Sequence, residues 1–171
     1  MNLVFRILLT VNATVWVIVV YCIKEELTIL PITPFYFSIT LLLIPVILSF
    51  VTIWLTMFLG KDNIKNCAKI EEADSSFLPV YLGYFFVGLS IDKIQPLVFV
   101  YLIIFIFTFV AQTQYFNPMY LLLGYRFYKI ETTEGTRVFL ITKKALRKSI
   151  GVEFSDLRRI NDTTYLDMGE I

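Results

Sequence analysis

Apolar residues fall in four long runs that are almost free of charge. The runs cover about residues 3–22, 35–59, 77–91 and 97–112, and Arg6 is the one charged residue within them. A helix that crosses the roughly 30 Å hydrocarbon layer of a bilayer needs about 20 apolar residues, a length that the second run exceeds. The pattern predicts an α-helical integral membrane protein with four transmembrane helices, formed by residues 1–116.

The third run is shorter than a full crossing requires. Residues 77–91 make about 22 Å of helix, so this segment either thins the bilayer, extends through polar ends or only re-enters the membrane. The long apolar run that follows favours two crossings. A poorly matched helix pair changes its energy when the bilayer is thinned or bent, although an ordinary short helix shielded by its neighbours explains the length equally. The candidate hinge or mismatch residues are Pro45, Gly83 and Gly88.

The composition changes in the last third of the chain. Residues 117–171 hold 16 of the 29 charged residues and read as a small cytoplasmic β-rich C-terminal tail. Residues 124–131 alternate apolar and charged side chains, Gly135 provides a turn, and residues 137–144 form a second apolar run. This order predicts a β-hairpin, with a further short strand at residues 164–168.

Basic residues indicate the orientation. The connection after the second run holds three lysines and the tail holds nine basic residues, whereas the first and third connections offer only Lys24 and Lys93. Because lysine and arginine are enriched in cytoplasmic loops, the loop and the tail are predicted to be cytoplasmic. Four crossings then place both termini of this multi-pass protein in the cytoplasm.

The residue types needed for catalysis are scarce. The chain has no histidine, its apolar runs contain no carboxylate, and it has no phosphate-binding glycine loop. Cys22 and Cys67 are predicted on opposite sides of the membrane, where they cannot pair. We therefore expect no enzyme activity, no catalytic residues, no metal and no cofactor.

Basic side chains on the cytoplasmic side are the candidate contacts for a partner protein. The segment KKALRKS also suits a solvated turn or a contact with anionic lipid. Direct binding of nucleic acid is disfavoured, because seven acidic residues accompany the nine basic residues of the tail. The candidate partner contacts are Lys61, Lys65, Lys69, Arg126, Lys129, Lys143, Lys144, Arg147 and Lys148.

The apolar runs, the junction FNPMYLLLGYRFYKIE at residues 116–131 and the run RVFLITKK resemble KwaA, the membrane component of the bacterial Kiwa anti-phage system. The resemblance covers nearly the whole chain. It implies a homo-oligomeric assembly, a tetramer, in the bacterial inner membrane. It also implies that this assembly senses phage attack at the envelope and works with a cytoplasmic DNA-binding partner, KwaB.

Two function classes follow. In the first, the chain is a non-enzymatic inner-membrane sensor and scaffold whose helices respond to the bilayer and whose cytoplasmic part recruits an effector. In the second, the oligomer is a channel or pore that depolarises the cell. A channel predicts ion flux and sensitivity to substitution of the uncharged polar residues Asn12, Thr52 and Gln112.

Overall fold

The computed structural model describes residues 3–28, 33–64, 67–75, 78–111, 117–146 and 152–169. Contacts divide the chain into two compact units. The helical unit comprises Asn2–Thr52 and Phe77–Asn117, and the sheet unit comprises Ile53–Ser76 and Pro118–Ile171. Each unit thus combines two segments that are distant in sequence, and each is considered by itself.

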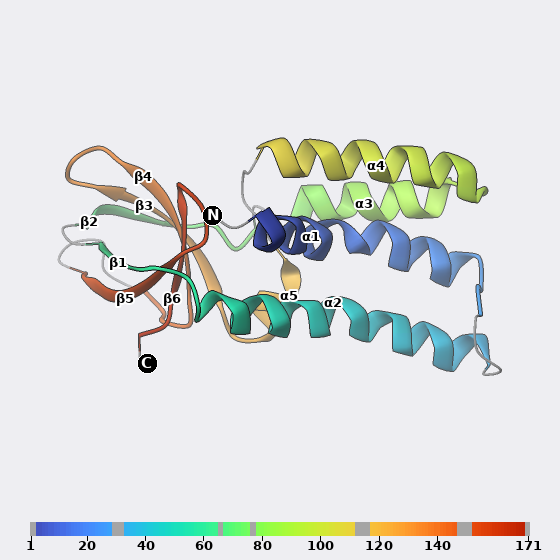
Figure 1. The fold of residues 1–171 in the computed structure, drawn as a ribbon, viewed down its shortest axis with the longest axis horizontal. Coiled ribbons are helices and arrows are strands. Elements are labelled where there is room, and N and C mark those ends of the chain that lie inside the picture. Colours follow the sequence, from blue (N-terminus) through green and yellow to red (C-terminus); the bar gives the residue numbers. More distant parts are fainter. Residues whose placement is uncertain are drawn as a thin grey trace. The chain divides into compact units, whose positions relative to one another are not determined.

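Five helices are found in the described residues, in the order shown in Figure 1. They are α1 (Leu3–Lys24), α2 (Pro34–Thr56), α3 (Leu78–Ser90), α4 (Ile94–Ala111) and α5 (Pro118–Leu122). Each of the last four has a proline among its first three residues. Proline suits this place because the backbone amides of the first turn have no partner within the helix. The prolines therefore help to fix where these helices begin.

The prediction of four transmembrane helices is wrong. In the described residues only α1, α2 and α4 are long and apolar enough to cross a membrane, whereas α3 has 13 residues and is about 20 Å long. Pro79 belongs in the first turn of α3, and the polar pair Asp92 and Lys93 follows its end. These neighbours limit the third apolar run to a short helix.

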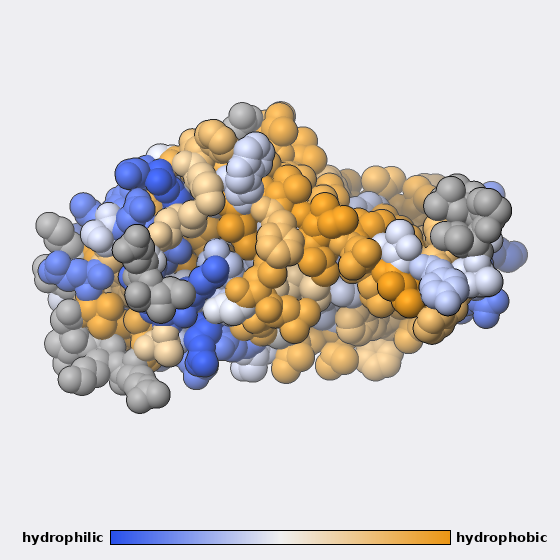
Figure 2. All heavy atoms as spheres, turned by 90° about the horizontal axis from the view of Figure 1, so that it is seen from below, coloured by the Kyte–Doolittle hydropathy of each residue, from blue (hydrophilic) through white to orange (hydrophobic). Residues whose placement is uncertain are grey.

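The long helices differ in how much of their surface is covered. Within the most apolar 18 residues of each, 56% of α1 is buried, compared with 22% of α2 and 6% of α4. On the face shown in Figure 2, hydrophobic side chains cover most of the helical unit, and many hydrophilic side chains lie over the strands. A water-soluble protein rarely exposes so continuous an apolar surface.

In the helical unit, α1 is the central element and packs against both α3 and α4. It runs parallel to α3, since Tyr81 donates a hydrogen bond to the carbonyl of Ala13 (3.4 Å) and Lys24 donates to the carbonyl of Ile91 (3.1 Å). It runs antiparallel to α4, where Tyr101 lies beside Thr14 at 3.3 Å. Tyr81 of α3 and Tyr101 of α4 thus contact α1, whereas other aromatic side chains of these helices, such as Phe86 and Phe107, are exposed.

The sheet unit contains a six-stranded sheet, which corrects the prediction of a small β-rich tail. The order across the sheet is β1-β5-β6-β4-β3-β2. Its outer strands, β1 and β2, come from the connection between α2 and α3 and not from the C-terminal region. The strands are β1 (Lys61–Ile64), β2 (Cys67–Glu72), β3 (Arg126–Thr132), β4 (Arg137–Thr142), β5 (Phe154–Arg159) and β6 (Thr164–Asp167).

The C-terminal strands combine a hairpin with a parallel pair. Strands β3 and β4 are antiparallel, with Tyr128 opposite Leu140, and Gly135 adopts a φ of 81° in the turn between them. A positive φ of this size suits glycine, which has no Cβ. Strand β6 lies parallel to β4, with Tyr165 beside Leu140, and antiparallel to β5. The strand expected at residues 164–168 is therefore present as β6.

Both faces of the sheet have buried apolar side chains. On one face, Tyr128, Ile130 and Leu140 belong to a core against which Leu146 and Val152 pack. On the other face, Phe127 stacks on Phe139 at 5.9 Å, and the ring of Tyr120 in α5 lies 6.3 Å from that of Phe127. A sheet covered in this way has a core of its own and differs from a flexible tail.

Cys67 offers a chemical test of this sheet. The thiol is 3% exposed, and burial raises its pKa, so little reactive thiolate is present near neutral pH. In a Cys22→Ser background we expect Cys67 to react with a maleimide at least about 100-fold more slowly in the folded protein than in denaturant. The rate of mass increase measures this. Equal rates in the two states would show that β2 is not held in the sheet.

Candidate functional site

A cluster of uncharged polar side chains lies inside the otherwise apolar helical unit. The side chain of Asn117 donates hydrogen bonds from Nδ2 to Oδ1 of Asn12 (2.7 Å) and to Oγ of Ser49 (2.8 Å). Asn12 in turn donates from Nδ2 to Oγ1 of Thr52 at 3.4 Å. Exposure of the four residues does not exceed 2%. We call Asn12, Ser49, Thr52 and Asn117 the polar cluster.

The regular spacing of helical residues places the α2 members of the cluster together. Pro45, Ser49 and Thr52 are buried and lie four and three positions apart, which puts them on one face of α2. Ser49 also donates from Oγ to the carbonyl of Pro45 (2.6 Å), and Thr52 donates to the carbonyl of Ser49 (2.8 Å). Most of the remaining residues of α2 are exposed or half-buried and apolar. The buried face of α2 is therefore its polar face.

Asn117 lies further along α1 than the end of α4 does. Near the end of α4, the carbonyl of Phe109 accepts hydrogen bonds from Nη2 (2.6 Å) and Nε (3.2 Å) of Arg6. Asn117 is bonded to Asn12, which lies six residues further along α1, a distance of about 9 Å. Asn117 is therefore placed beside the middle of α1, whereas Phe109 lies near its N-terminal end.

The chemistry of the polar cluster is that of neutral hydrogen bonding. Its groups are two amides and two hydroxyls, and none of them can act as an acid or base near neutral pH. In a membrane, such groups stabilise helix association by hydrogen bonding across the contact. The arrangement suits the positioning of helices rather than catalysis. Among the described residues there is also no group of histidine, cysteine and acidic side chains that could hold a metal ion.

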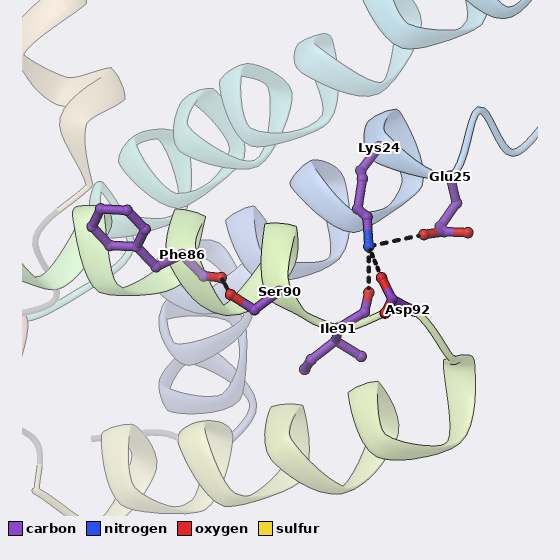
Figure 3. Close-up of polar contacts among 6 residues, drawn as sticks. All are labelled: Lys24, Glu25, Phe86, Ser90, Ile91 and Asp92. Carbon is purple, nitrogen blue, oxygen red and sulfur yellow. Dashed lines mark hydrogen bonds and ion pairs between the residues drawn. The ribbon is translucent and has the colours of Figure 1, made fainter.

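A second polar group joins the end of α1 to the turn between α3 and α4. Figure 3 shows the Lys24 ammonium directed at the carbonyl of Ile91, the carboxylate of Asp92 and the carboxylate of Glu25. The hydrogen bond and charge of Lys24 lower the pKa of Asp92. These groups are accessible to solvent, so the ion pairs contribute little to stability. Their effect is to align the ends of α1 and α3.

The three candidate hinge or mismatch residues have different surroundings. Pro45 lies within α2, which continues through it as one helix (Figure 1). Gly88 is tightly packed, because a Cβ built there would lie 3.0 Å from the carbonyl oxygen of Val17 and from Cβ of Val20. Gly83 has no atom within 4 Å of the same position. Only Gly88 therefore has a defined role, the close approach of α3 to α1.

The candidate partner contacts of β1, β2 and β3 lie on the sheet and are mostly ion-paired. Lys61 lies 3.8 Å from Asp156, and Arg126 lies 3.7 Å from Glu72. Lys69 pairs with Glu71, which lowers the pKa of that carboxyl group. Because the ion pairs are exposed, their replacement by ion pairs with a partner would cost little free energy.

Around Lys129, charges of opposite sign alternate across three strands. Lys129 faces Glu71 in the neighbouring strand β2, and Glu131 lies between Lys69 of β2 and Arg137 of β4. Arg137 approaches Glu131 at 3.6 Å, and its side chain is 83% exposed. We call these five residues the charged face. It is accessible and carries three positive and two negative charges.

Lys143 and Lys144 are engaged within the sheet unit. The ammonium of Lys143 lies 5.0 Å from the ring centre of Tyr125. The ammonium of Lys144 lies 3.6 Å from the carboxylate of Asp167, which is buried and also accepts a hydrogen bond from Thr142 (2.7 Å). Both lysines therefore stabilise the local structure of the sheet unit, in addition to any contact that they make with a partner. Lys65, Arg147 and Lys148 lie outside the described residues.

Only part of the polar cluster is recognisable from local sequence. Asn12 and Thr52 were recognisable as polar residues in apolar runs, and Ser49 as a small residue suited to helix packing. Asn117 marked only the end of the membrane region, and nothing in its neighbourhood indicates a partner in α1. The Asn-Pro pair before an apolar segment was its sole local sign. Gln112, named with them for a pore, lies outside the described residues.

Comparison with known proteins identifies a family. The family described as anti-phage protein KwaA matches residues 5–166, which is nearly the whole chain. No curated protein matches the chain. No solved structure matches it either. The family match includes most of α1, nearly all of the sheet and the Asn117 junction that carried the resemblance, and the chain therefore belongs to the KwaA family of anti-phage defence proteins.

Proposed function

We propose that this chain is a non-enzymatic sensor and scaffold in the bacterial inner membrane, and that its sheet unit recruits a cytoplasmic effector during anti-phage defence. The exposed apolar surface of α2 and α4 is the observation that carries this proposal. Lipid is the solvent that such a surface requires. The sheet unit has a core and a charged surface of its own, so it suits contact with a soluble partner.

The pairing of β2 with β3 supports the proposal that both segments of the sheet unit lie on the same side of the membrane. Strands β2 and β3 are paired, although α3 and α4 lie between them in sequence. A sheet with charged outer strands remains in water, so Glu72 and Arg126 are expected on the same side of the bilayer. The lysines of β1 and β2 favour the cytoplasm as this side.

The expected partner is a DNA-binding protein of the KwaB kind, and the expected assembly of the chain is a homo-oligomer, a tetramer. Both follow from the family resemblance. The charged face is the best candidate for the partner contact, because Arg137 and Lys69 are exposed and paired only with exposed carboxylates. Contact with nucleic acid would then be made by the partner and not by this chain.

Charge reversal on the charged face tests the recruitment. In the full chain, we expect the double substitution Lys129→Glu and Arg137→Glu to lower co-purification of the partner by about tenfold or more. Each change places a second carboxylate beside Glu71 or Glu131 and reverses a charge that the partner would meet. The measurement is the amount of partner retained on the tagged chain in mild detergent. Protection against phage should fall in parallel.

Lys93→Glu is the matched control. Lys93 is exposed, and Lys93→Glu repeats the type of charge reversal made by each of the two substitutions, but Lys93 lies in the turn between α3 and α4 and not in the sheet unit. It should leave the partner bound. Retention of the partner by the double variant would exclude the charged face, and absence of the partner from the wild-type complex would contradict the scaffold itself.

The channel interpretation receives less support from the polar cluster. Asn12 and Thr52, which a pore lining would expose to ions, are buried and bonded to each other within one chain. Ion flux through the purified protein in liposomes would reverse this preference. We therefore retain the sensor and scaffold as the proposed function.

A further inference from the structure

Helix α2 makes fewer close backbone contacts within the helical unit than α1 and α4 make. Within the helical unit, α1 packs closely against α3 and α4, but no comparable backbone contact joins α2 to any of the described helices. The buried residues in the C-terminal half of α2 are Pro45, Ser49, Thr52 and Thr56, which offer little apolar area. In lipid, apolar area adds little to helix association, so hydrogen bonds and close packing must hold such a helix.

The polar cluster supplies these hydrogen bonds. Asn117 bonds to Asn12 of α1 and to Ser49 of α2 at the same time, and Asn12 bonds directly to Thr52 of α2. All of the groups are buried, so a broken bond would leave a polar group without water to replace its partner. Asn117 is thus the side chain that bridges the two helices.

Asn117 is the last residue before the connection to the sheet unit. The next residue, Pro118, begins α5, and the chain then enters β3, which lies between β4 and β2 in the sheet. The other cluster residues of α2, Ser49 and Thr52, lie shortly before the connection to β1. Both covalent links that run from these elements to the sheet unit therefore start close to the cluster.

We propose that the polar cluster is a latch: Asn117 holds α2 against α1, and a displacement of α2 is passed through Asn117 to the segment that leads into α5 and β3. The inference adds a regulatory element to the proposed function, and its functional arm rests on that function. The structural arm, that α2 is held by these bonds, stands independently of it.

Distance measurements test the structural arm. Spin labels at positions 7 and 47, both exposed, report the separation of α1 and α2 in the full-length protein in lipid nanodiscs, with Cys22 and Cys67 replaced by serine. We expect Asn117→Ala to widen the distance distribution by about twofold, because two bonds across the helix contact are lost. A second label pair at positions 7 and 103 reports α1 and α4 and should not change.

Two serines of α2 provide a matched comparison. Ser38 and Ser49 each donate to the carbonyl four residues earlier, but Ser38 is only partly buried and bonds to no other helix in the described residues, whereas Ser49 accepts the bond from Asn117. Ser49→Ala should widen the distribution and Ser38→Ala should not. The double variant Ser49→Ala with Asn117→Ala should widen the distribution by less than the sum of the two single effects, since the two residues share the Asn117–Ser49 bond, although Ser49 also donates to Oδ1 of Asn12 at 3.5 Å.

The outcomes separate the latch from a general loss of structure. An unchanged α1 to α2 distribution in Asn117→Ala, or equal widening in Ser38→Ala and Ser49→Ala, would overturn the latch. Widening of the α1 to α4 pair as well would also overturn it, because the helical unit as a whole would then have loosened.

Phage challenge tests the functional arm. We expect Asn117→Ala to lose protection by about tenfold or more while the partner still co-purifies at the wild-type level, because the charged face is untouched. Full protection in Asn117→Ala with a widened distance distribution would overturn transmission through Asn117. If the wild-type chain itself fails to bind a partner, the proposed function fails, and the distance measurements still decide whether the latch exists.

Discussion

A leucine in place of Gly88 is expected to force α3 away from α1. Even a Cβ at this position would lie 3.0 Å from the carbonyl oxygen of Val17 and from two side-chain atoms of Val20. The carbonyl belongs to the α1 backbone and cannot rotate away as a long side chain can. Overpacking of this kind costs about 1–3 kcal/mol or more, and we expect the upper part of this range for Gly88→Leu.

Thermal unfolding of the full chain in detergent measures the effect. Gly83→Leu is the matched control, because it makes the same substitution in the same helix at a position with no atom within 4 Å. Leucine also favours helix more than glycine does, so the control should be neutral or slightly stabilising. If both variants unfold at the same temperature, then α1 and α3 are not in close contact.

Truncation of Phe127 to alanine is expected to destabilise the sheet unit by about 3–5 kcal/mol. Phe127 is 0% exposed, and its ring lies between those of Tyr120 and Phe139. Its backbone also accepts a hydrogen bond from Ala73 (2.8 Å), which alanine retains. The loss should therefore come from the cavity between α5 and the sheet and not from broken strand pairing.

The reactivity of Cys67 in increasing denaturant follows this loss, because the thiol lies in the core on the opposite face of the sheet. Lys129→Ala is the control from the same strand: its side chain is exposed, so its effect should stay within about 0.5 kcal/mol. An equal denaturation midpoint for Phe127→Ala and the wild type would show that α5 does not cover this face.

The hydrophobic pattern predicts some strands of the sheet but not β1 and β2. The strands β3, β4 and β6 were visible because apolar side chains recur along them, as in RVFLIT. Strands β1 and β2 have the sequences KDNI and CAKIEE, in which most side chains are polar and exposed. Outer strands need few apolar residues, and charged residues protect them from pairing with other chains. Their sequences therefore resembled a solvated loop.

The three long apolar helices could be predicted from the sequence because their apolar character depends on local composition. A run of apolar residues favours lipid whatever it packs against, and this places α1, α2 and α4 at nearly their observed bounds. The length of α3 was less certain, since apolar residues flank Pro79 on both sides and only the folded chain shows where the helix begins. The family could also be recognised, because its junction motif is a continuous segment.

The tertiary structure alone decided which distant residues meet. Asn12, Ser49 and Asn117 are separated by up to 105 positions, and each by itself is an ordinary polar residue near or within an apolar run. The same holds for β2 and β3, which pair although α3, α4 and α5 lie between them in sequence. Composition and periodicity describe what a segment prefers as its surroundings. Hydrogen bonds between remote segments depend on the path of the whole chain, and a local pattern therefore cannot specify them.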